Sequence, residues 1–283
     1  MTLACAQATL FPPLLPMPLD DAIETTTPSR VLNVVKGVVQ TVQDYTVLSL
    51  EAAAGVFRTP MYLDDALYQM DVIGTGSLPI VMLTGFFIGA VMVLQTSAQF
   101  SRFGETALVG DVVAISIVRE LGPSITSLLV AGRNSSGIAS ELGSMLVTEQ
   151  VDAMRAMGTD PIKKLVTPRV LATTLMLPLL TAVSDFIGLV GGYVISHFQL
   201  RLDPVQYWSR AIHALEFGDL VQGLVKPVIF GFILSSVGCY YGLNARGGTR
   251  GVGRATTQAV VTASVLILVS NFFLTRLLLY IFP

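Results

Sequence analysis

The sequence predicts an all-α integral membrane protein. Hydrophobic residues make up 52% of its 283 residues and charged residues only 13%, a composition far more apolar than that of a soluble domain. The mean hydropathy is +0.69. Five windows are long enough to cross about 30 Å of hydrocarbon, which takes roughly 20 apolar helical residues. We therefore expect transmembrane helices over 78–100, 108–142, 168–198, 220–243 and 255–282.

The residues ahead of the first span have a different pattern. Residues 1–28 hold no Lys or Arg, and the run FPPLLPMP breaks what would be a signal-peptide core, so we expect a disordered or loosely attached tail there. Residues 29–57 carry apolar positions at helical spacing that charged residues interrupt, which favours an interfacial helix. A second amphipathic segment follows Thr59-Pro60. We expect one membrane domain over 29–283, with interfacial helices over 29–76.

Prolines and glycines within the predicted spans indicate where the helices bend and where they pack closely. The second window is too long for one straight span at ~1.5 Å per residue, so we expect it to kink near Gly122-Pro123 or to extend beyond the membrane. Pro178 and Pro227 should bend the third and fourth spans. Small residues at helical-turn spacing predict close helix packing in the first and third spans, at Gly85, Gly89, Gly188 and Gly192.

The distribution of basic residues predicts a cytoplasmic N-terminus, because Lys and Arg stay preferentially on the cytoplasmic side of a membrane. With five spans and a cytoplasmic N-terminus, ten basic residues lie on the cytoplasmic side and three on the outer side. The inner ones are Arg30, Lys36, Arg58, Arg155, Lys163, Lys164, Arg169, Arg246, Arg250 and Arg254, and the outer ones are Arg102, Arg201 and Arg210.

A short amphipathic helix is predicted between the second and third spans. Thr148 can cap it and Gly158 can end it. Its apolar stripe consists of Val147, Val151 and Met154, and its polar positions include Glu149, Gln150, Asp152 and Arg155. Such a helix either docks a partner protein or lies on the membrane, and the pattern leaves both open.

The second span carries charges that are costly in lipid unless they face the protein interior or a wet cavity. Arg119 and Glu120 are neighbours, so they point to different sides of a helix and each needs its own partner. For Glu120 we weigh an ion pair between helices equally with lipid contact. For Arg119 we favour either contact with a lipid headgroup, whose phosphate a planar guanidinium can bind with two hydrogen bonds, or a position that guards the pocket entrance. Gly122 and Pro123 complete this candidate lipid pocket.

Other intramembrane charges are interpreted as structural. Arg133 lies nearer the cytoplasmic end of the second span, and Asp185 lies deep in the third. Lys226 and Arg276 are expected to extend to the membrane interface, which is the less costly arrangement for a long cation near a helix end.

The sequence contains no pattern for independent chemistry. It lacks a glycine-rich loop ending in Gly-Lys-Ser/Thr, an HExxH pair and a GxSxG elbow, so we expect no catalytic residue, cofactor or metal site. Cys5 and Cys239 have no metal-ligand spacing. The net charge of -2, without a basic cluster among aromatics, argues against nucleic-acid binding.

A series of ordered motifs resembles one family. They are Arg119-Glu120-Leu121-Gly122-Pro123, Ala131-Gly132-Arg133, Glu141-Leu142-Gly143, Thr148-Glu149-Gln150, Asp160-Pro161, Pro168-Arg169, Pro178-Leu179-Leu180 and Arg254-Ala255-Thr256-Thr257. This run is similar to that of the MlaE permeases, the membrane subunits of ABC lipid transporters that work with MCE-domain proteins. The similarity extends from about Val31 to the C-terminus.

The resemblance implies a homodimer in the bacterial inner membrane, with a lipid pocket between its two chains. It also implies ATPase subunits on the cytoplasmic side, which would receive residues 148–158 as a coupling helix and hydrolyse ATP in place of this chain. An MCE-domain protein on the periplasmic side would carry phospholipid toward or from the outer membrane, whose lipid asymmetry such systems maintain.

Two other functions remain possible from the residues. A proton-coupled secondary transporter of a small solute could use Asp185 and Glu120, although the absence of an internal repeat weakens this reading. A non-transporting scaffold could use residues 148–158 only to recruit a partner.

Overall fold

The computed structural model describes residues 28–56, 62–103, 108–200 and 203–281. The chain divides into two compact units, Met1–Asp44 and Tyr45–Pro283, with the boundary inside helix α1 (Pro28–Gly55). In the first unit, α1 exposes the apolar side chains of Val39 and Val42, as expected of a helix on a membrane surface. The predicted tail over 1–28 lies outside the described residues, except for Pro28.

The second unit is a bundle of long helices, and the predicted fold class is confirmed. Among the described residues, five helical stretches are long and apolar enough to cross a membrane: Leu63–Phe100, Val109–Val147, Ile162–Gln199, Phe217–Leu243 and Gly248–Ile281. The first is α2, which is followed by η2 (Ser101–Phe103), and the last two are α9 and α10. Shorter helices connect the stretches: α6 (Gln150–Ala156) and α8 (Pro204–Ala214).

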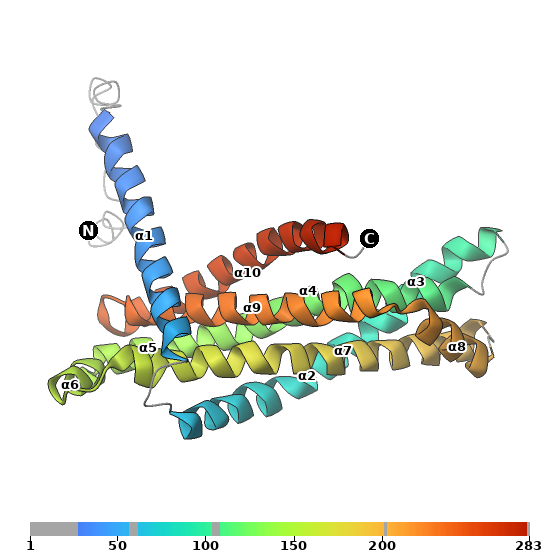
Figure 1. Ribbon diagram of the computed structural model, residues 1–283, viewed down its shortest axis with the longest axis horizontal. Coiled ribbons are helices and arrows are strands. Elements are labelled where there is room, and N and C mark those ends of the chain that lie inside the picture. Colours follow the sequence, from blue (N-terminus) through green and yellow to red (C-terminus); the bar gives the residue numbers. More distant parts are fainter. Residues whose placement is uncertain (1–27, 57–61, 104–107, 201–202, 282–283) are drawn as a thin grey trace, which may run out of the picture. The chain divides into compact units, whose positions relative to one another are not determined.

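Figure 1 shows α6 and α8 at opposite ends of this bundle, so we call these the α6 end and the α8 end. Because successive spans alternate in direction, the second span and α10 run antiparallel.

The first span begins earlier than predicted. Helix α2 runs unbroken from Leu63 through Pro79 to Phe100, where we expected an interfacial segment ahead of a separate span. Asp64 and Asp65 lie in its first turn, where negative charge favours a helix N-terminus. Asp65 also forms an ion pair with Lys164. These acidic residues therefore stabilise the start of the helix.

The second span contains two wide turns rather than a sharp kink. It consists of α3 (Val109–Ser116), the π-helical turn η4 (Ile117–Leu121), α4 (Gly122–Val130), the π-helical turn η5 (Ala131–Ser135) and α5 (Ser136–Val147). In η4 the Gly122 N–H donates to the carbonyl of Ile117, five residues back. Each such turn inserts an extra residue and changes the direction of the side chains on it, which is common at functional sites.

The third span begins with the π-helical turn η6 (Ile162–Val166) and continues as α7 (Thr167–Leu200), which packs closely against α2. A Cβ atom at Gly89 would overlap the backbone of Gly188, and one at Gly85 would lie 2.6 Å from the Ser184 carbonyl oxygen. The glycines of the first and third spans therefore form packing surfaces as predicted, and the structure shows that these two surfaces pack on each other. The main core joins side chains from several spans, including Val81, Val130, Leu177, Phe230 and Ile267.

Helix α8 lies across the end of the second span. The carboxylate of Asp203 caps it by accepting a 3.2 Å hydrogen bond from the N–H of Val205. Gly110 of α3 allows the α8 backbone to approach closely, and Arg210 pairs with Asp111 at 3.4 Å. This packing places α8 beside the start of α9.

Candidate functional site

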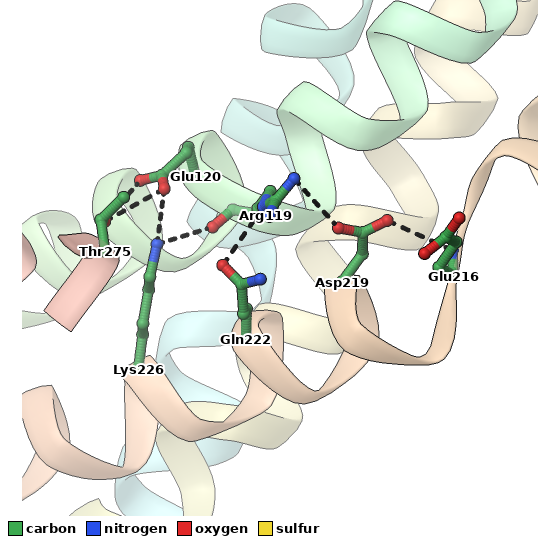
Figure 2. Close-up of polar contacts among 7 residues, drawn as sticks. All are labelled: Arg119, Glu120, Glu216, Asp219, Gln222, Lys226 and Thr275. Atoms are coloured by element: carbon green, nitrogen blue, oxygen red, sulfur yellow. Dashed lines mark hydrogen bonds and ion pairs between the residues drawn. The ribbon is translucent and has the colours of Figure 1, made fainter. Parts of the chain in front are cut away.

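A network of charged and polar side chains joins η4, α9 and α10 (Figure 2). The Arg119 side chain extends from η4 toward α9, where its Nε donates to Oε1 of Gln222 at 3.2 Å. Its Nη1 lies 3.5 Å from Oδ1 of Asp219. A neutral amide and a carboxylate therefore hold the guanidinium.

Glu120 forms the second half of this network. Its Oε1 lies 2.7 Å from Nζ of Lys226 and accepts a 3.1 Å hydrogen bond from the hydroxyl of Thr275 on α10. The side chain of Lys226 is 0% exposed and that of Glu120 is 36% exposed. The ion pair thus connects one fully buried charge to one that remains accessible.

Lys226 makes a second contact, with the backbone of η4. Pro123 has no N–H, so it cannot donate to the carbonyl of Arg119 four residues back, as it would in a regular α-helix. Nζ of Lys226 donates to the Arg119 carbonyl oxygen at 2.9 Å. The lysine therefore binds both a backbone carbonyl and a carboxylate.

Two glycines allow the backbones to come close enough for this network. A Cβ atom at Gly223 would lie 2.6 Å from the Val118 carbonyl oxygen, so α9 packs directly on the backbone of η4. Behind η4, Gly122 contacts the carboxylate of Asp185 on α7. Larger side chains at either glycine would separate the elements that carry the network.

The position of Asp219 is fixed by its role in starting α9. Glu216 and Asp219 form a capping box, in which the Glu216 N–H donates to Oδ2 of Asp219 at 3.2 Å. The other carboxylate oxygen, Oδ1, is the one that faces Arg119. A local capping motif therefore also positions the acid that balances Arg119.

A pocket of about 430 Å³ opens beside Arg119, toward the α8 end. It is lined by Ile115, Arg119, Ala214, Glu216, Gly218, Asp219, Gln222 and Ile281. The Arg119 side chain is 25% exposed and has five N–H donors, so it retains donors for an anion in the pocket. The lining is mainly polar, with the carboxylates of Glu216 and Asp219 near the guanidinium, and Ile115, Ala214 and Ile281 supply its apolar part.

Comparisons of the sequence with known proteins identify a family. Residues 66–277 match the family described as Permease MlaE. A probable ABC transporter permease protein of Rickettsia felis is 45% identical over 238 residues, which cover 84% of this chain and 92% of that protein. The chain belongs to the MlaE permease family.

Relatives with more specific names are also similar. The intermembrane phospholipid transport system permease protein MlaE of Haemophilus influenzae is 34% identical over 211 residues, covering 74% of this chain and 81% of that protein. The chloroplastic protein TRIGALACTOSYLDIACYLGLYCEROL 1 of Arabidopsis thaliana is 37% identical over 219 residues, which cover 77% of this chain and 63% of that protein. The region matched to the MlaE family includes the whole charge network.

The structure places the predicted pocket residues of this MlaE-family chain in two roles. Arg119 and Glu120 meet in one network, and Glu120 forms the ion pair between helices that we weighed against lipid contact. Gly122 and Pro123 are buried and shape the backbone beneath the network instead of adding to its surface. The prediction that Lys226 extends to the interface is wrong, because Glu120 and a free carbonyl stabilise its charge inside the bundle.

Four of the residues in the network of Figure 2 were not predicted: Glu216, Asp219, Gln222 and Thr275. A sequence signal for two of them exists, since Asp219, Gln222 and Lys226 follow one another at spacings of three and four and so share one helix face. Thr275 carries no comparable signal, because a lone threonine in an apolar helix commonly bonds to its own backbone.

Arg133 and Asp185 have separate surroundings. Arg133 packs on Gly76 and donates to the Ser77 hydroxyl at 2.8 Å, so it connects η5 to α2 as a structural residue. Asp185 is 8% exposed, and its Oδ1 has no hydrogen-bond partner among the described residues. Neither side chain lines the pocket beside Arg119.

The short connecting helix α6 forms, and two of the three residues of its predicted apolar stripe face this chain. Val151 is 0% exposed and packs with Ala52, Leu142 and Leu165, and Met154 packs against the same cluster. Val147, at the end of α5, is 39% exposed. Val151 and Met154 therefore attach α6 to this chain, so we no longer expect these two residues to form a docking surface.

The predicted start of α6 is wrong, whereas its predicted end is confirmed. Thr148 does not cap the helix: its hydroxyl donates to the Ser144 carbonyl of the preceding helix at 2.9 Å. Glu149, with a left-handed φ of 59°, occupies the cap position instead. Gly158 does end the helix, with φ +76° and an N–H that donates to the Arg155 carbonyl at 3.0 Å.

The outward face of α6 consists of exposed residues: Glu149, Gln150, Asp152, Ala153, Arg155, Ala156 and Met157. Asp152 and Arg155 form an exposed ion pair at 3.1 Å. Met157 is 73% exposed beside them. This charged face with one methionine is the part of α6 available to another protein.

Proposed function

We propose that this chain is the permease subunit of an ATP-driven phospholipid transporter in the bacterial inner membrane. The observation that carries the proposal is the partly exposed Arg119 within the second span, held by Gln222 and Asp219 at the edge of a pocket that combines polar groups with the apolar side chains of Ile115 and Ile281. The name of the Haemophilus influenzae relative supports phospholipid as the substrate class.

The phosphate of the lipid binds the free N–H groups of Arg119. A guanidinium is suited to this because its planar N–H donors match two phosphate oxygens. The phosphate exchanges its hydrogen bonds with water for hydrogen bonds with these donors, which is favourable in a low-dielectric site. Asp219 balances the charge of the guanidinium before the lipid arrives, and Glu216 adds a second carboxylate to the pocket lining. The acyl chains lie along apolar surface such as Ile115 and Ile281.

A second copy of the chain closes the pocket. The apolar window of α10 is only 11% buried, and its exposed side chains include Val265, Leu268, Phe272 and Phe273. Thr275 on the same helix belongs to the charge network, so a partner that packs on α10 also borders the site. The resulting homodimer encloses an amphiphile between two equivalent surfaces.

ATP binding and hydrolysis take place in separate ATPase subunits on the cytoplasmic side. With the N-terminus cytoplasmic, the α6 end faces these subunits, and the exposed face of α6 is the coupling surface. ATP-driven closure of the subunits pushes on α6, which is anchored by Val151, and tilts the two chains relative to each other. The α8 end faces the periplasm, where an MCE-domain protein exchanges lipid with the pocket and connects it to the outer membrane.

The proposal is tested with the permease and its ATPase subunits reconstituted in phospholipid nanodiscs. Wild-type complex is expected to contain bound phospholipid by native mass spectrometry and to hydrolyse ATP faster in nanodiscs than in lipid-free detergent. Arg119→Ala should lower the amount of bound phospholipid and the lipid-stimulated rate of ATP hydrolysis by about tenfold or more, since it removes charge-assisted hydrogen bonds. Arg102→Ala, at an exposed arginine outside the network, serves as the matched control.

Two results would contradict the proposal. The first is a wild-type complex without bound phospholipid and without lipid-stimulated ATPase activity. The second is transport that continues without the ATPase subunits and stops when a proton gradient is removed, which would favour the secondary transporter.

A further inference from the structure

The pocket beside Arg119 carries more negative charge than positive charge. Among the described residues that line it, Arg119 is the one cation, and Glu216 and Asp219 are both acidic. One guanidinium and two carboxylates leave one negative charge in excess. A ligand that is anionic as a whole would increase this excess, and like charges placed close together cost free energy, most of all where water is excluded. The lining therefore favours a ligand that also brings a positive charge.

Asp219 does not supply the excess charge, because both of its carboxylate oxygens already have partners in the protein. Its Oδ1 lies 3.5 Å from Nη1 of Arg119, and its Oδ2 accepts the 3.2 Å hydrogen bond from the N–H of Glu216. The residue is 6% exposed. Asp219 thus balances the charge of Arg119, and the negative charge that remains belongs to Glu216.

Glu216 retains the capacity to bind a cation. It is exposed at the pocket, and none of the ion pairs among the described residues includes it. The capping box at the start of α9 involves one N–H group, which occupies only part of a carboxylate, since a carboxylate has two oxygens and about four lone-pair sites. The Glu216 carboxylate is therefore available to a positively charged group of a ligand.

The opposite charges of the pocket are separated in space. Figure 2 shows Arg119, Asp219 and Glu216 in a row, with Asp219 in the middle. Gln222, which is 0% exposed, keeps the guanidinium at its end of the row, because its Oε1 accepts from Nε of Arg119 at 3.2 Å. The pocket thus offers hydrogen-bond donors on one side and the Glu216 carboxylate on the other.

We propose that this pocket selects zwitterionic phospholipids over anionic ones, with the Glu216 carboxylate binding the ammonium group of a headgroup whose phosphate lies at Arg119. This inference rests on the proposed function, in which Arg119 binds the phosphate. In phosphatidylethanolamine a short carbon linker joins the phosphate to the ammonium group, and Arg119 and Glu216 border the same space of about 430 Å³. The two ends of one headgroup can therefore reach both residues.

Phosphatidylglycerol is the informative comparison. Its phosphate is the same, but its headgroup ends in uncharged hydroxyl groups. Bound at Arg119, it would leave Glu216 without a cation and bring a further unbalanced negative charge into the pocket. Phosphatidylcholine ends in a trimethylammonium group, which has the positive charge without N–H donors. Selection by charge therefore predicts that phosphatidylcholine, too, is held in preference to phosphatidylglycerol.

The test uses the complex of permease and ATPase subunits in nanodiscs with equal amounts of phosphatidylethanolamine and phosphatidylglycerol, and native mass spectrometry of the bound lipid. Wild type is expected to hold phosphatidylethanolamine over phosphatidylglycerol by about tenfold, the effect of one charge-assisted hydrogen bond. With phosphatidylcholine in place of phosphatidylethanolamine, the preference should be about threefold, because the attraction between the charges remains without the hydrogen bond.

Variants of Glu216 change the charge of the pocket and leave Arg119 intact. Glu216→Gln keeps the size of the side chain and should lower the preference for phosphatidylethanolamine about threefold. Glu216→Lys should invert it in favour of phosphatidylglycerol. Asp203→Asn is the matched control and should leave the ratio unchanged. It removes one exposed negative charge near the same end of the bundle but outside the pocket lining, and asparagine can still cap α8.

The outcomes distinguish this inference from the proposed function. A wild-type ratio near one, or a Glu216→Lys variant that keeps the wild-type ratio, overturns selection by Glu216 while phospholipid binding at Arg119 stands. A preference for phosphatidylethanolamine that phosphatidylcholine does not share also overturns it, because hydrogen bonding would then decide instead of charge. Wild-type complex without any of these lipids contradicts the proposed function instead.

Discussion

Nζ of Lys226 lies 2.7 Å from the Glu120 carboxylate and 2.9 Å from the Arg119 carbonyl oxygen, with no part of the lysine side chain exposed. One buried cation thus connects α9 to the two residues of η4 whose side chains point toward the pocket and toward α10. The position of the binding site depends on this connection.

Removing the carboxylate should destabilise the protein more than removing both charges. Glu120→Ala leaves Lys226 buried without its anion, which typically costs about 3–5 kcal/mol, although the partial exposure of Glu120 reduces this. Glu120→Gln/Lys226→Met replaces the pair by neutral groups of similar volume and should recover most of the loss. Thermal unfolding in detergent measures the stability of each variant. Equal melting temperatures for Glu120→Ala and Glu120→Gln/Lys226→Met would contradict the claim that Glu120 stabilises the buried Lys226.

Pro123→Ala should weaken the network without unfolding the helix. Alanine restores an N–H that can donate to the Arg119 carbonyl, so it competes with Lys226 for that oxygen. We expect equal or higher thermal stability together with slower lipid-stimulated ATP hydrolysis. A variant with unchanged ATPase activity would show that the freed carbonyl has no role in transport.

Gly223→Ala should separate α9 from η4. The added methyl group would lie 2.6 Å from the Val118 carbonyl oxygen, and such overpacking typically costs about 1–3 kcal/mol. Gly137→Ala is the matched control, because a Cβ atom there has nothing within 4 Å and alanine is the better helix former. The prediction fails if the two alanine variants have the same unfolding temperature.

The two faces of α6 should respond differently to charged substitutions. Val151→Asp places a charge in a fully buried position and should prevent folding of the α6 end. Asp152→Arg/Arg155→Asp reverses an exposed ion pair and should leave thermal stability unchanged while it lowers ATPase binding at least about tenfold. Size-exclusion chromatography with the ATPase subunits measures binding, and undiminished co-elution of the double variant would exclude this face as the docking surface.

The number and order of the spans were predictable because hydrophobic length alone determines them. The individual roles of the charged residues were not, since they depend on distances between helices. Lys226 has a long flexible side chain that fits an interface as well as an interior, and only the proximity of Glu120 and the carbonyl freed by Pro123 decides between them. Likewise, the apolar stripe of α6 predicts that one face is buried, but not that Leu142 and Leu165 of the same chain cover it.

The central claim is that the Arg119 guanidinium binds the phosphate of the transported lipid. Solid-state NMR of the reconstituted complex can measure dipolar coupling between ¹⁵N-labelled arginine side chains and lipid ³¹P, with Arg119→Lys as the reference in which all other arginines remain. The account predicts a strong ¹⁵N–³¹P coupling in wild type, as expected for hydrogen-bonded N and O atoms about 2.8 Å apart, that is lost in Arg119→Lys. Identical coupling in the two samples would contradict it.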